Sequence, residues 1–242
     1  MPFFSVLLHN IDMDEKLLEF QKLAKIFHEH GYHLYLVGGT VRDYLLGIKL
    51  DDMDAVSEAT PKEISAFLPS VDTTFAHLGS LKYKSDSGLK FDITTLREES
   101  GYLDGRHPSN IVFVKDLAID YQRRDFTINA LYMDSNLNVI DYCNGKDDLK
   151  NHLLKMVGDP ETRIKEDPLR ILRAIRFHLM FNLKIDDDLL KAMHSNFSLL
   201  KNTTDAKIRS ELNKIKDEQV DQEMKKDIFA QFDIANLQGV IK

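Results

Sequence analysis

Closely spaced carboxylates follow a Gly-Gly turn near the N-terminal end of this sequence. The stretch YLVGGTVRDYLLGIKLDDMD contains Asp52 and Asp54 as an Asp-x-Asp pair. Side chains at positions i and i+2 of a strand point the same way, so both carboxylates can hold one ion. Oxygen ligands of this kind suit Mg²⁺, which completes its shell with water and substrate phosphates. The alternative is a solvated acidic turn with no ligand.

The residues around this pair favour the metal site. Gly38 and Gly39 can bring backbone N–H groups close to phosphate oxygens, and the helix that follows adds its N-terminal dipole. Thr40 either caps that helix or contacts phosphate. A further acid, Asp92, lies in the strand-like segment KFDITTL and can reach the same site. Together these groups indicate a nucleoside triphosphate bound with metal.

Composition excludes several other classes of protein. The 242 residues are 43 % hydrophobic and 29 % charged, with a net charge of −7, which argues against a protein that simply coats DNA or RNA. The single cysteine, Cys143, allows neither a disulfide framework nor a cysteine-based zinc site, so we expect a cytoplasmic protein. No membrane span, H-E-x-x-H zinc motif or Walker phosphate loop is present.

The elements that must position these residues form an α+β arrangement. Apolar periodicity predicts a helix over residues 12–30, whereas HLYLVGG, MDAV, LKYKS, KFDITTL and IVFV read as strands. Glycines nearly vanish after Gly158 and helical periodicity dominates. We therefore predict a head with a mixed β-sheet flanked by helices, an all-helical neck and a short helical C-terminus. The expected bounds are 1–145, 146–215 and 216–242.

Motifs in a fixed order give a family resemblance. LVGGTVRDYLLGIKLDDMD is followed by FDITTLR, YLDGRHP, YQRRDFTINALY, NGKDDLK, EDPLRILRAIRF and IRSEL. This order resembles the class II tRNA nucleotidyltransferases and bacterial poly(A) polymerases over roughly residues 34–215. The resemblance implies a template-independent transferase that uses CTP and ATP, acts on the tRNA 3′ acceptor end, and employs two Mg²⁺ ions during catalysis. DNA is not expected as a partner, and no oligomeric state is predicted.

The resemblance also implies roles in the head. Asp52 and Asp54 would be the metal ligands and catalytic residues, with Asp92 as the assisting carboxylate. Gly39, Thr40 and Arg42 would line the triphosphate and ribose; the alternative for Arg42 is an exposed helix arginine. In RRDFTINAL, Arg124 is the expected nucleotide contact with Arg123 beside it. Asp125 and Asn129 are four apart and are expected on one helical face, where they either brace the site or act as helix caps.

In the neck, EDPLR carries a pair that can read a base. Asp167 and Arg170 are three apart on a predicted helix and are therefore expected on one face, where the carboxylate can accept from an exocyclic amine and the guanidinium can donate to a ring acceptor. Cytosine and adenine match that pair, whereas guanine and uracil do not. Glu166 either caps the helix or holds Arg170. Arg173 and Arg176 either reach phosphate or pack along the neck.

The sequence also bears on which nucleotides the enzyme adds. EESGYLDGR resembles the flexible loop that accompanies the switch from C to A addition, and places Asp104, Gly105 and Arg106 there. Full CCA addition is therefore expected. The alternatives are A-only or CC-only addition, a poly(A) polymerase, or an RNA-binding module without catalysis. Only about 27 residues follow IRSELNKI, which predicts either a compact enzyme or a shortened chain and leaves contacts with the tRNA elbow open.

Overall fold

The computed structural model describes residues 3–51, 53–101 and 109–234, with side chains from residue 13 onward. The chain divides into two compact units. The first contains Met1–Glu99, Ile111–Arg124 and Ile128–Gly145, and the second contains Ser100–Asn110, Asp125–Thr127 and Lys146–Lys242. The division at residues 145 and 215 stays a prediction of domain organisation.

The first unit is built on one mixed sheet. Among the described residues six strands are joined in the order β3-β4-β2-β1-β7-β8, and only β2 and β4 run parallel. The elements of this unit, with the arm formed by β5 and β6, are α1 (Phe3–Glu29), β1 (Leu34–Val37), α2 (Gly39–Leu45), β2 (Met53–Ser57), α3 (Pro61–Phe67), β3 (Ser80–Lys84), β4 (Lys90–Thr95), β5 (Arg97–Ser100), β6 (Asn110–Phe113), α4 (Leu117–Asp120), β7 (Leu131–Met133) and β8 (Val139–Asp141), with 3-10 turns at Ala76–Leu78, Tyr121–Arg123 and Thr127–Asn129.

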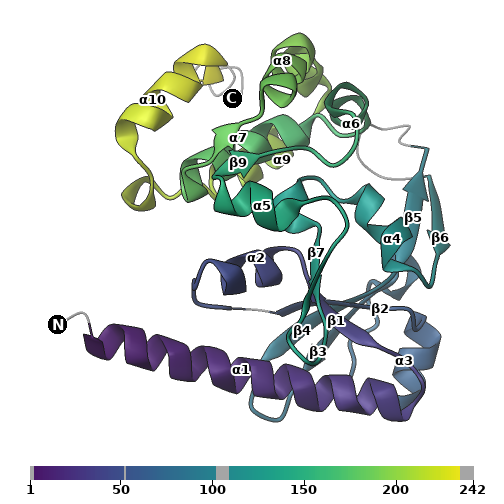
Figure 1. Cartoon of the computed structure of the whole chain (residues 1–242). Coiled ribbons are helices and arrows are strands. Elements are labelled where there is room, and N and C mark those ends of the chain that lie inside the picture. Colours follow the sequence, from purple (N-terminus) through teal and green to yellow (C-terminus); the bar gives the residue numbers. More distant parts are fainter. Residues whose placement is uncertain (1–2, 52, 102–108, 235–242) are drawn as a thin grey trace. The chain divides into compact units, whose positions relative to one another are not determined.

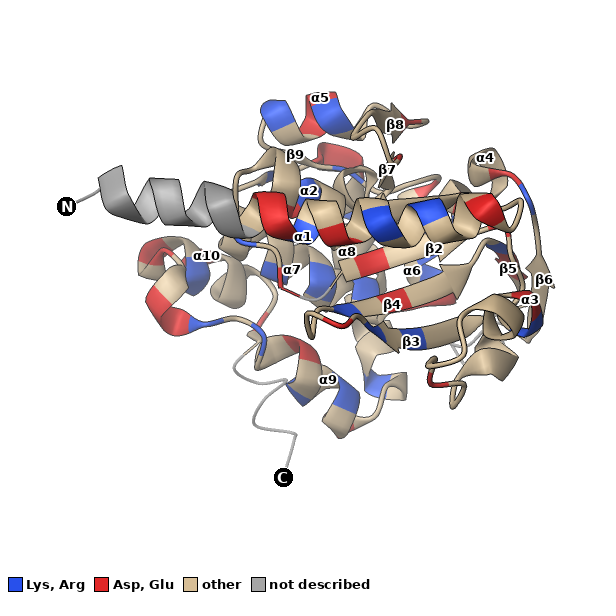
Figure 2. Ribbon diagram, turned by 90° about the horizontal axis from the view of Figure 1, so that it is seen from below, with Lys and Arg blue, Asp and Glu red and all other residues tan. Residues whose placement is uncertain are grey.

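Helix α1 covers one face of this sheet (Figure 1). Its buried stripe includes Leu17, Phe20, Leu23, Ala24 and Phe27, which repeat at helical spacing within the predicted range 12–30. Figure 2 shows charged residues of both signs on the outward side of α1. The helix begins at Phe3, earlier than predicted. Its packing on the sheet buries the core on this face and leaves the opposite face for other side chains.

Alternation along the strands decides which side chains reach the opposite face. Met53 and Ala55 of β2, like Phe91 of β4, lie in the core beneath α1. Neighbouring positions in a strand point to opposite faces, so Asp54 and Asp92 lie on the face away from α1. The predicted strands around both carboxylates are confirmed.

The second unit is mainly helical. Its elements are α5 (Gly145–Lys150), β9 (Leu153–Leu154), α6 (Pro160–Glu166), α7 (Leu169–Phe181), β10 (Lys184–Ile185), α8 (Asp187–Asn196), α9 (Asp205–Leu212) and α10 (Gln222–Gln231), with 3-10 turns at Phe197–Asn202 and Asp217–Gln219. Leu169, Leu172, Ile175 and Leu179, which lie at helical spacing in the sequence, are buried in this unit. The short parallel pair of β9 and β10 corrects the expectation of an all-helical neck.

Candidate functional site

The central feature of the first unit is a pair of carboxylates on adjacent strands. Asp54 of β2 and Asp92 of β4 are direct register partners in the parallel ladder, so their side chains leave the same face one strand spacing apart, about 4.8 Å. Asp54 is exposed and Asp92 is partly exposed, with Lys82 Nζ 3.5 Å from Asp92 Oδ1. Asp52 lies outside the described residues. The sheet therefore brings together two acids that are 38 positions apart in the chain.

These two carboxylates fit the ligand chemistry of Mg²⁺. The ion takes hard oxygen donors, usually one or two protein carboxylates, and leaves positions for water and phosphate. Within residues 53–101 and 109–234, no cluster of three or more His, Cys, Asp or Glu side chains forms a closed metal cage. An open pair of this kind suits an ion shared with a substrate.

Thr40 ties helix α2 to the strand that carries Asp54. Its hydroxyl accepts a hydrogen bond from Asp54 N at 2.9 Å, and the residue is buried. The helix is capped by Gly38 without a side-chain bond, so the reading of Thr40 as the cap is wrong. Thr40 fixes the backbone from which the Asp54 carboxylate projects.

The turn before α2 depends on Gly38. Its φ of 65° and ψ of −126° favour glycine, since a side chain is strained there. Gly38 N donates to Leu131 O at 3.0 Å, so this amide is used by the fold. The first hydrogen bond of helix α2 runs from Arg42 N to Gly38 O. The amides of Gly39 and Thr40 come before it and therefore have no acceptor within the helix. Backbone donation to phosphate is therefore expected from these two residues.

Arg42 is a buried brace. It is 7 % exposed, and its Nη1 donates to Asn129 Oδ1 at 2.6 Å, while Nε and Nη2 donate to Asp43 Oδ1 at 2.9 and 2.7 Å. Burial raises the pKa of Asp43 above its ordinary value although Arg42 opposes that shift. The alternative of an exposed helix arginine is wrong. Asn129 braces α2 through this bond, whereas Asp125 and Asn129 do not share a helix, since only Thr127–Asn129 forms a 3-10 turn.

Arg124 lies beside the Gly38 turn, held by a buried acid. Its Nη2 donates to Asp120 Oδ2 at 2.9 Å and its Nε to Tyr132 Oη at 3.0 Å. A Cβ placed on Gly38 would lie 3.6 Å from Arg124 Nη1. Burial raises the pKa of Asp120, but Arg124 and Arg123 outweigh it, so the pKa lies well below its ordinary value.

Sequence reasoning missed Asp120 and Tyr132. The spacing Asp120-x-x-Arg123-Arg124 was the available signal, because residues three and four apart on a helix face each other. Nothing in the local pattern marked Tyr132, which comes from β7.

The second unit uses its arginines differently from the sequence prediction. Asp167 is the C-cap of α6 and not part of a helix, and its Oδ1 accepts from Leu169 N at 3.1 Å. The premise that Asp167 and Arg170 share a helical face is therefore wrong. Arg170 is buried, and its Nη1 donates to Arg163 O and to Glu166 Oε2, the latter at 3.0 Å. Glu166 thus holds Arg170, one of the two roles considered for it.

The next two arginines of α7 also have partners within this unit. Arg173 Nε donates to Asp125 Oδ2 at 2.8 Å, and Nη2 bonds the same oxygen. Arg176 Nε donates to Glu211 Oε2 at 3.2 Å, and its guanidinium lies 4.2 Å from the centre of the Phe177 ring. Asp125 raises the pKa of Arg173, whereas burial lowers that of Arg176. Packing along the neck is therefore at least part of the role of both.

The predicted switching loop, Asp104, Gly105 and Arg106, lies outside the described residues. The chain on either side of it is held together, because Ser109 N donates to Gly101 O at 2.9 Å. A Cβ on Gly101 would lie 2.2 Å from Ser109 Oγ, so glycine allows this close approach.

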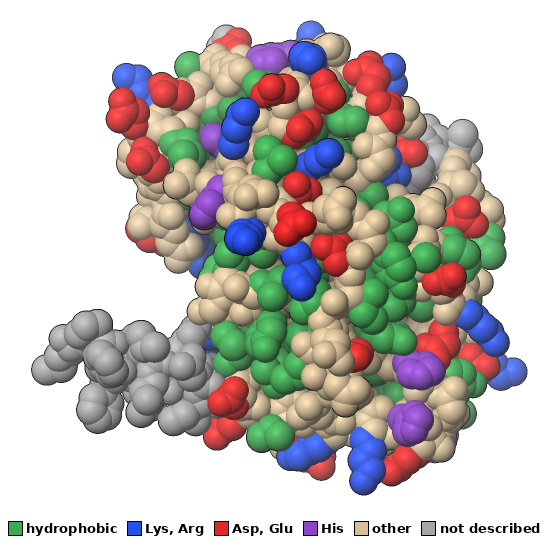
Figure 3. Space-filling view, in the orientation of Figure 1, with side chains coloured by type: hydrophobic (Ala, Val, Ile, Leu, Met, Phe, Trp, Pro, Cys, Tyr) green, Lys and Arg blue, Asp and Glu red, His purple; other side chains and the backbone are tan. Residues whose placement is uncertain are grey.

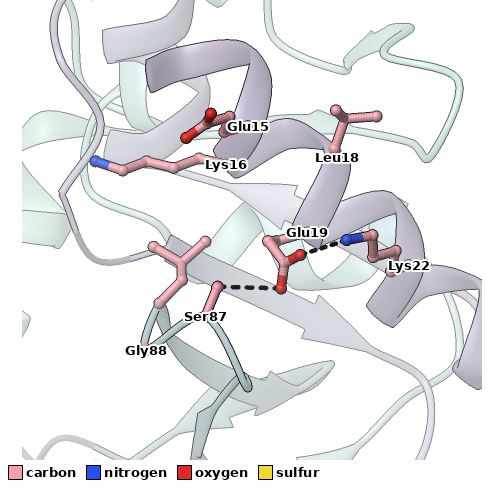
Figure 4. A pocket seen from close by; sticks show the side chains of 8 residues that line it. Glu15, Lys16, Leu18, Glu19, Lys22, Ser87 and Gly88 are labelled. Carbon is pink, nitrogen blue, oxygen red and sulfur yellow. Dashed lines mark hydrogen bonds and ion pairs between the residues drawn. The ribbon is translucent and has the colours of Figure 1, made fainter. Parts of the chain in front are cut away.

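A separate hollow lies between α1 and the turn that joins β3 to β4 (Figure 4). Two of its charged side chains pair with each other: Glu19 accepts from Lys22 Nζ at 2.6 Å, and also from Ser87 Oγ at 3.2 Å. It contains none of the predicted site residues. We therefore place the candidate site at the sheet carboxylates.

Comparison with known families matches residues 34–155 to the Poly A polymerase head domain. CCA-adding enzymes of Staphylococcus haemolyticus and Limosilactobacillus reuteri are 41 % identical over 193 residues and 44 % over 194 residues. Each alignment covers 80 % of this chain, and 48 % and 47 % of the respective relative. The chain thus spans about half the length of these curated relatives.

Solved structures give the same relationship. The Bacillus stearothermophilus CCA-adding enzyme in complex with CTP matches 82 % of this chain and 48 % of its own, with a TM-score of 0.75 and 30 % identity. The Thermotoga maritima CCA-adding enzyme complexed with tRNA-CCA matches 91 % and 51 %, with a TM-score of 0.72 and 30 % identity. No described helix has the length and apolar character that crossing a bilayer requires.

Proposed function

Because this chain belongs to the family of the Poly A polymerase head domain, we propose that it adds CCA to the 3′ end of tRNA from CTP and ATP. The observation that carries the proposal is the register pairing of Asp54 with Asp92 on a face beside the Gly38 turn. The likeness to CCA-adding enzymes solved with CTP and with tRNA-CCA supports the choice of substrates.

The reaction is a nucleotidyl transfer. The oxygen of the RNA 3′-hydroxyl forms a bond to the α-phosphorus while the bond from that phosphorus to the bridging oxygen breaks. Pyrophosphate leaves with the electron pair, and Asp92 accepts the hydroxyl proton. Asp52 and Asp54 would hold two Mg²⁺ ions, which when bound stabilise charge on the phosphates and lower the pKa of the attacking hydroxyl.

The chain's own residues supply binding and orientation. Gly39 and Thr40 offer amides to the triphosphate, and Arg124 offers a cation beside the same turn. Arg42 contributes by holding α2 in place through Asp43 and Asn129. The nucleotide thus meets donors whose positions the fold has already set, which lowers the cost of ordering them.

Base choice is proposed for Asp167 and Arg170 of the second unit. A carboxylate can accept from an exocyclic amine and a guanidinium can donate to a ring acceptor. Cytosine and adenine both offer that combination. Glu166 and Arg163 O orient the Arg170 guanidinium, so the reading group does not depend on a shared helical face. Arg173 and Arg176 support this region through Asp125 and Glu211.

Charge on the surface bears on RNA binding. On the face shown in Figure 3, Lys and Arg side chains are scattered among acidic ones, and the net charge is −7. Non-specific RNA affinity is therefore expected to be weak and to fall steeply with salt.

A primer-extension assay tests the proposal. The chain, Mg²⁺ and tRNAs ending before the first C, after CC, or complete would be offered each nucleoside triphosphate singly and in combination. Ordered addition of two C and one A, with GTP and UTP refused, is the expected result. A long A tail would identify a poly(A) polymerase, and additions that stop at CC or begin only after CC would identify the partial enzymes. No incorporation on any primer would contradict catalysis and favour an RNA-binding module.

A further inference from the structure

The most heavily bonded buried acid of the described first unit is Asp120, which is 0 % exposed. Its Oδ1 accepts from Arg97 N at 3.1 Å and from Arg123 Nε at 2.8 Å. Its Oδ2 accepts from Arg124 Nη2 at 2.9 Å and from Tyr132 Oη at 2.7 Å. A buried carboxylate with this many donors has a fixed position, because any movement breaks several bonds.

This fixed acid determines where Arg124 lies. The Arg124 guanidinium contacts Asp120 through Nη2 and Tyr132 through Nε, and its carbon lies 5.0 Å from the centre of the Tyr132 ring. Tyr132 is the register partner of Val37, the last residue of β1 before the Gly38 turn. The guanidinium is therefore held next to the turn by groups on two different elements, α4 and β7.

We propose that Asp120 and Tyr132 are positioning residues that hold the Arg124 guanidinium against the Gly38 turn for contact with the triphosphate of the incoming nucleotide. This inference rests on the proposed function and deepens it. Neither residue touches the nucleotide. They act by removing the rotational freedom that a long arginine side chain otherwise loses on binding.

A purely structural role for the cluster makes a different prediction. If the bonds only stabilise the fold, weakening them lowers the melting temperature and leaves nucleotide affinity unchanged. Asp120→Asn is too disruptive to separate the two roles, because Arg123 and Arg124 both depend on that charge. Tyr132→Phe is the sharper variant, since it deletes one hydroxyl that bonds both Asp120 and Arg124 and keeps the ring.

The matched control is Tyr142→Phe. Tyr142 is 43 % exposed and packs edge-on to the Tyr132 ring with 6.5 Å between ring centres. It belongs to the same aromatic cluster, but it takes no part in the hydrogen bonds from Arg124 to Asp120 and Tyr132. A general effect of removing a hydroxyl from this cluster would appear in both variants.

The experiment measures the affinity of the full chain for CTP, ATP and inorganic tripolyphosphate by calorimetry without RNA, and then KM and kcat in primer extension. In Tyr132→Phe we expect Kd and KM to rise about tenfold, which corresponds to about 1.4 kcal/mol. The kcat should change less than twofold, and Tyr142→Phe should match the wild type. Tripolyphosphate should lose affinity by the same factor as CTP, because the contact is to phosphate.

Three results would overturn the inference. Unchanged Kd values in a folded Tyr132→Phe would remove the positioning role and leave the proposed function standing. A loss confined to kcat would show that the Tyr132 hydroxyl affects a step other than nucleotide binding. A wild-type chain with no affinity for CTP, ATP or tripolyphosphate would overturn the proposed function together with this inference.

Discussion

The carboxylates on the sheet of the first unit and the arginines of α7 in the second unit differ in how their charges are balanced. Asp54 and Asp92 lie side by side on a sheet face where their like charges repel, and Lys82 forms an ion pair with Asp92. Arg170 and Arg176, by contrast, are each paired with a carboxylate of the same unit. Adjacent acids at a surface favour an external cation, whereas paired arginines mainly set positions.

The difference also separates two kinds of sequence signal. Backbone geometry directs side chains at positions i and i+2 of a strand to the same face. An Asp-x-Asp pattern therefore allows shared chemistry to be predicted from the sequence alone. Arginines at three-residue spacing only share a helix side, and their long side chains find partners from other elements. The following predictions test this contrast.

The largest effect is expected from Asp54→Ala. If Asp54 holds Mg²⁺ as proposed, loss of its carboxylate should lower the rate of nucleotide incorporation about a thousandfold, the equivalent of about 4 kcal/mol. Single-turnover primer extension measures it. Asp86→Ala, at an exposed position in the β3–β4 turn, is the control and should retain activity. Activity in Asp54→Ala comparable to that of the wild type would contradict a catalytic role for the sheet carboxylates.

Asp120→Asn should lower the free energy of unfolding by about 3 kcal/mol at pH 7, because the partly buried Arg123 and Arg124 lose their buried counter-charge. The folded pKa of Asp120 lies below its ordinary 3.8, so the ionised group stabilises the fold above that pH. As the pH falls below about 3.8, this stabilisation is lost and the difference between wild type and variant should narrow. Urea unfolding at several pH values measures it, with Asp86→Asn as control. A pH-independent difference would contradict the charge argument.

Arg170→Lys tests whether a paired neck arginine still reads a base. Lysine keeps the charge but loses the planar fork that contacts Arg163 O and Glu166. We expect incorporation of CTP to fall about thirtyfold, or about 2 kcal/mol, and its advantage over UTP to shrink. Competition between the two nucleotides in primer extension gives the ratio. Lys191→Ala, an exposed change on α8, should leave it unaltered. An unchanged ratio in Arg170→Lys would assign Arg170 to packing alone.

Glu211→Gln should have the smallest effect, about 1.5 kcal/mol at pH 7, through weaker bonds to Arg176 and Lys214. Burial raises the pKa of Glu211, but Lys214 and Arg176 outweigh it, so the folded pKa lies below the ordinary 4.5. Its stabilisation is present above pH 4.5 and is lost as the pH falls through the folded value. Thermal melts at pH 7 and pH 3.5 measure the change, against Glu223→Gln at an exposed position. A loss as large as that of Asp120→Asn would contradict the smaller stabilisation expected from the Glu211 pairs.

Local chemistry allowed much of the fold to be predicted. Thr60-Pro61 followed by Glu63 is a sequence pattern typical of a helix start, and the structure has the full capping box there. The buried stripes of α1 and α7 and the strands around Asp54 and Asp92 follow apolar periodicity, which depends only on neighbouring residues. The start of α1 and the β9–β10 pair were missed, since two-residue strands carry no period to detect.

By itself, the sequence determined which chemistry is available: oxygen ligands at Asp52 and Asp54, a Gly-Gly turn before a helix, and an acid-arginine motif at 166–170. The tertiary structure alone decided the partners. The parallel ladder set Asp92 beside Asp54, β7 brought Tyr132 to Arg124, and α9 brought Glu211 to Arg176. Such contacts join residues between 8 and 38 positions apart, and their geometry depends on how whole elements pack, which no local spacing encodes.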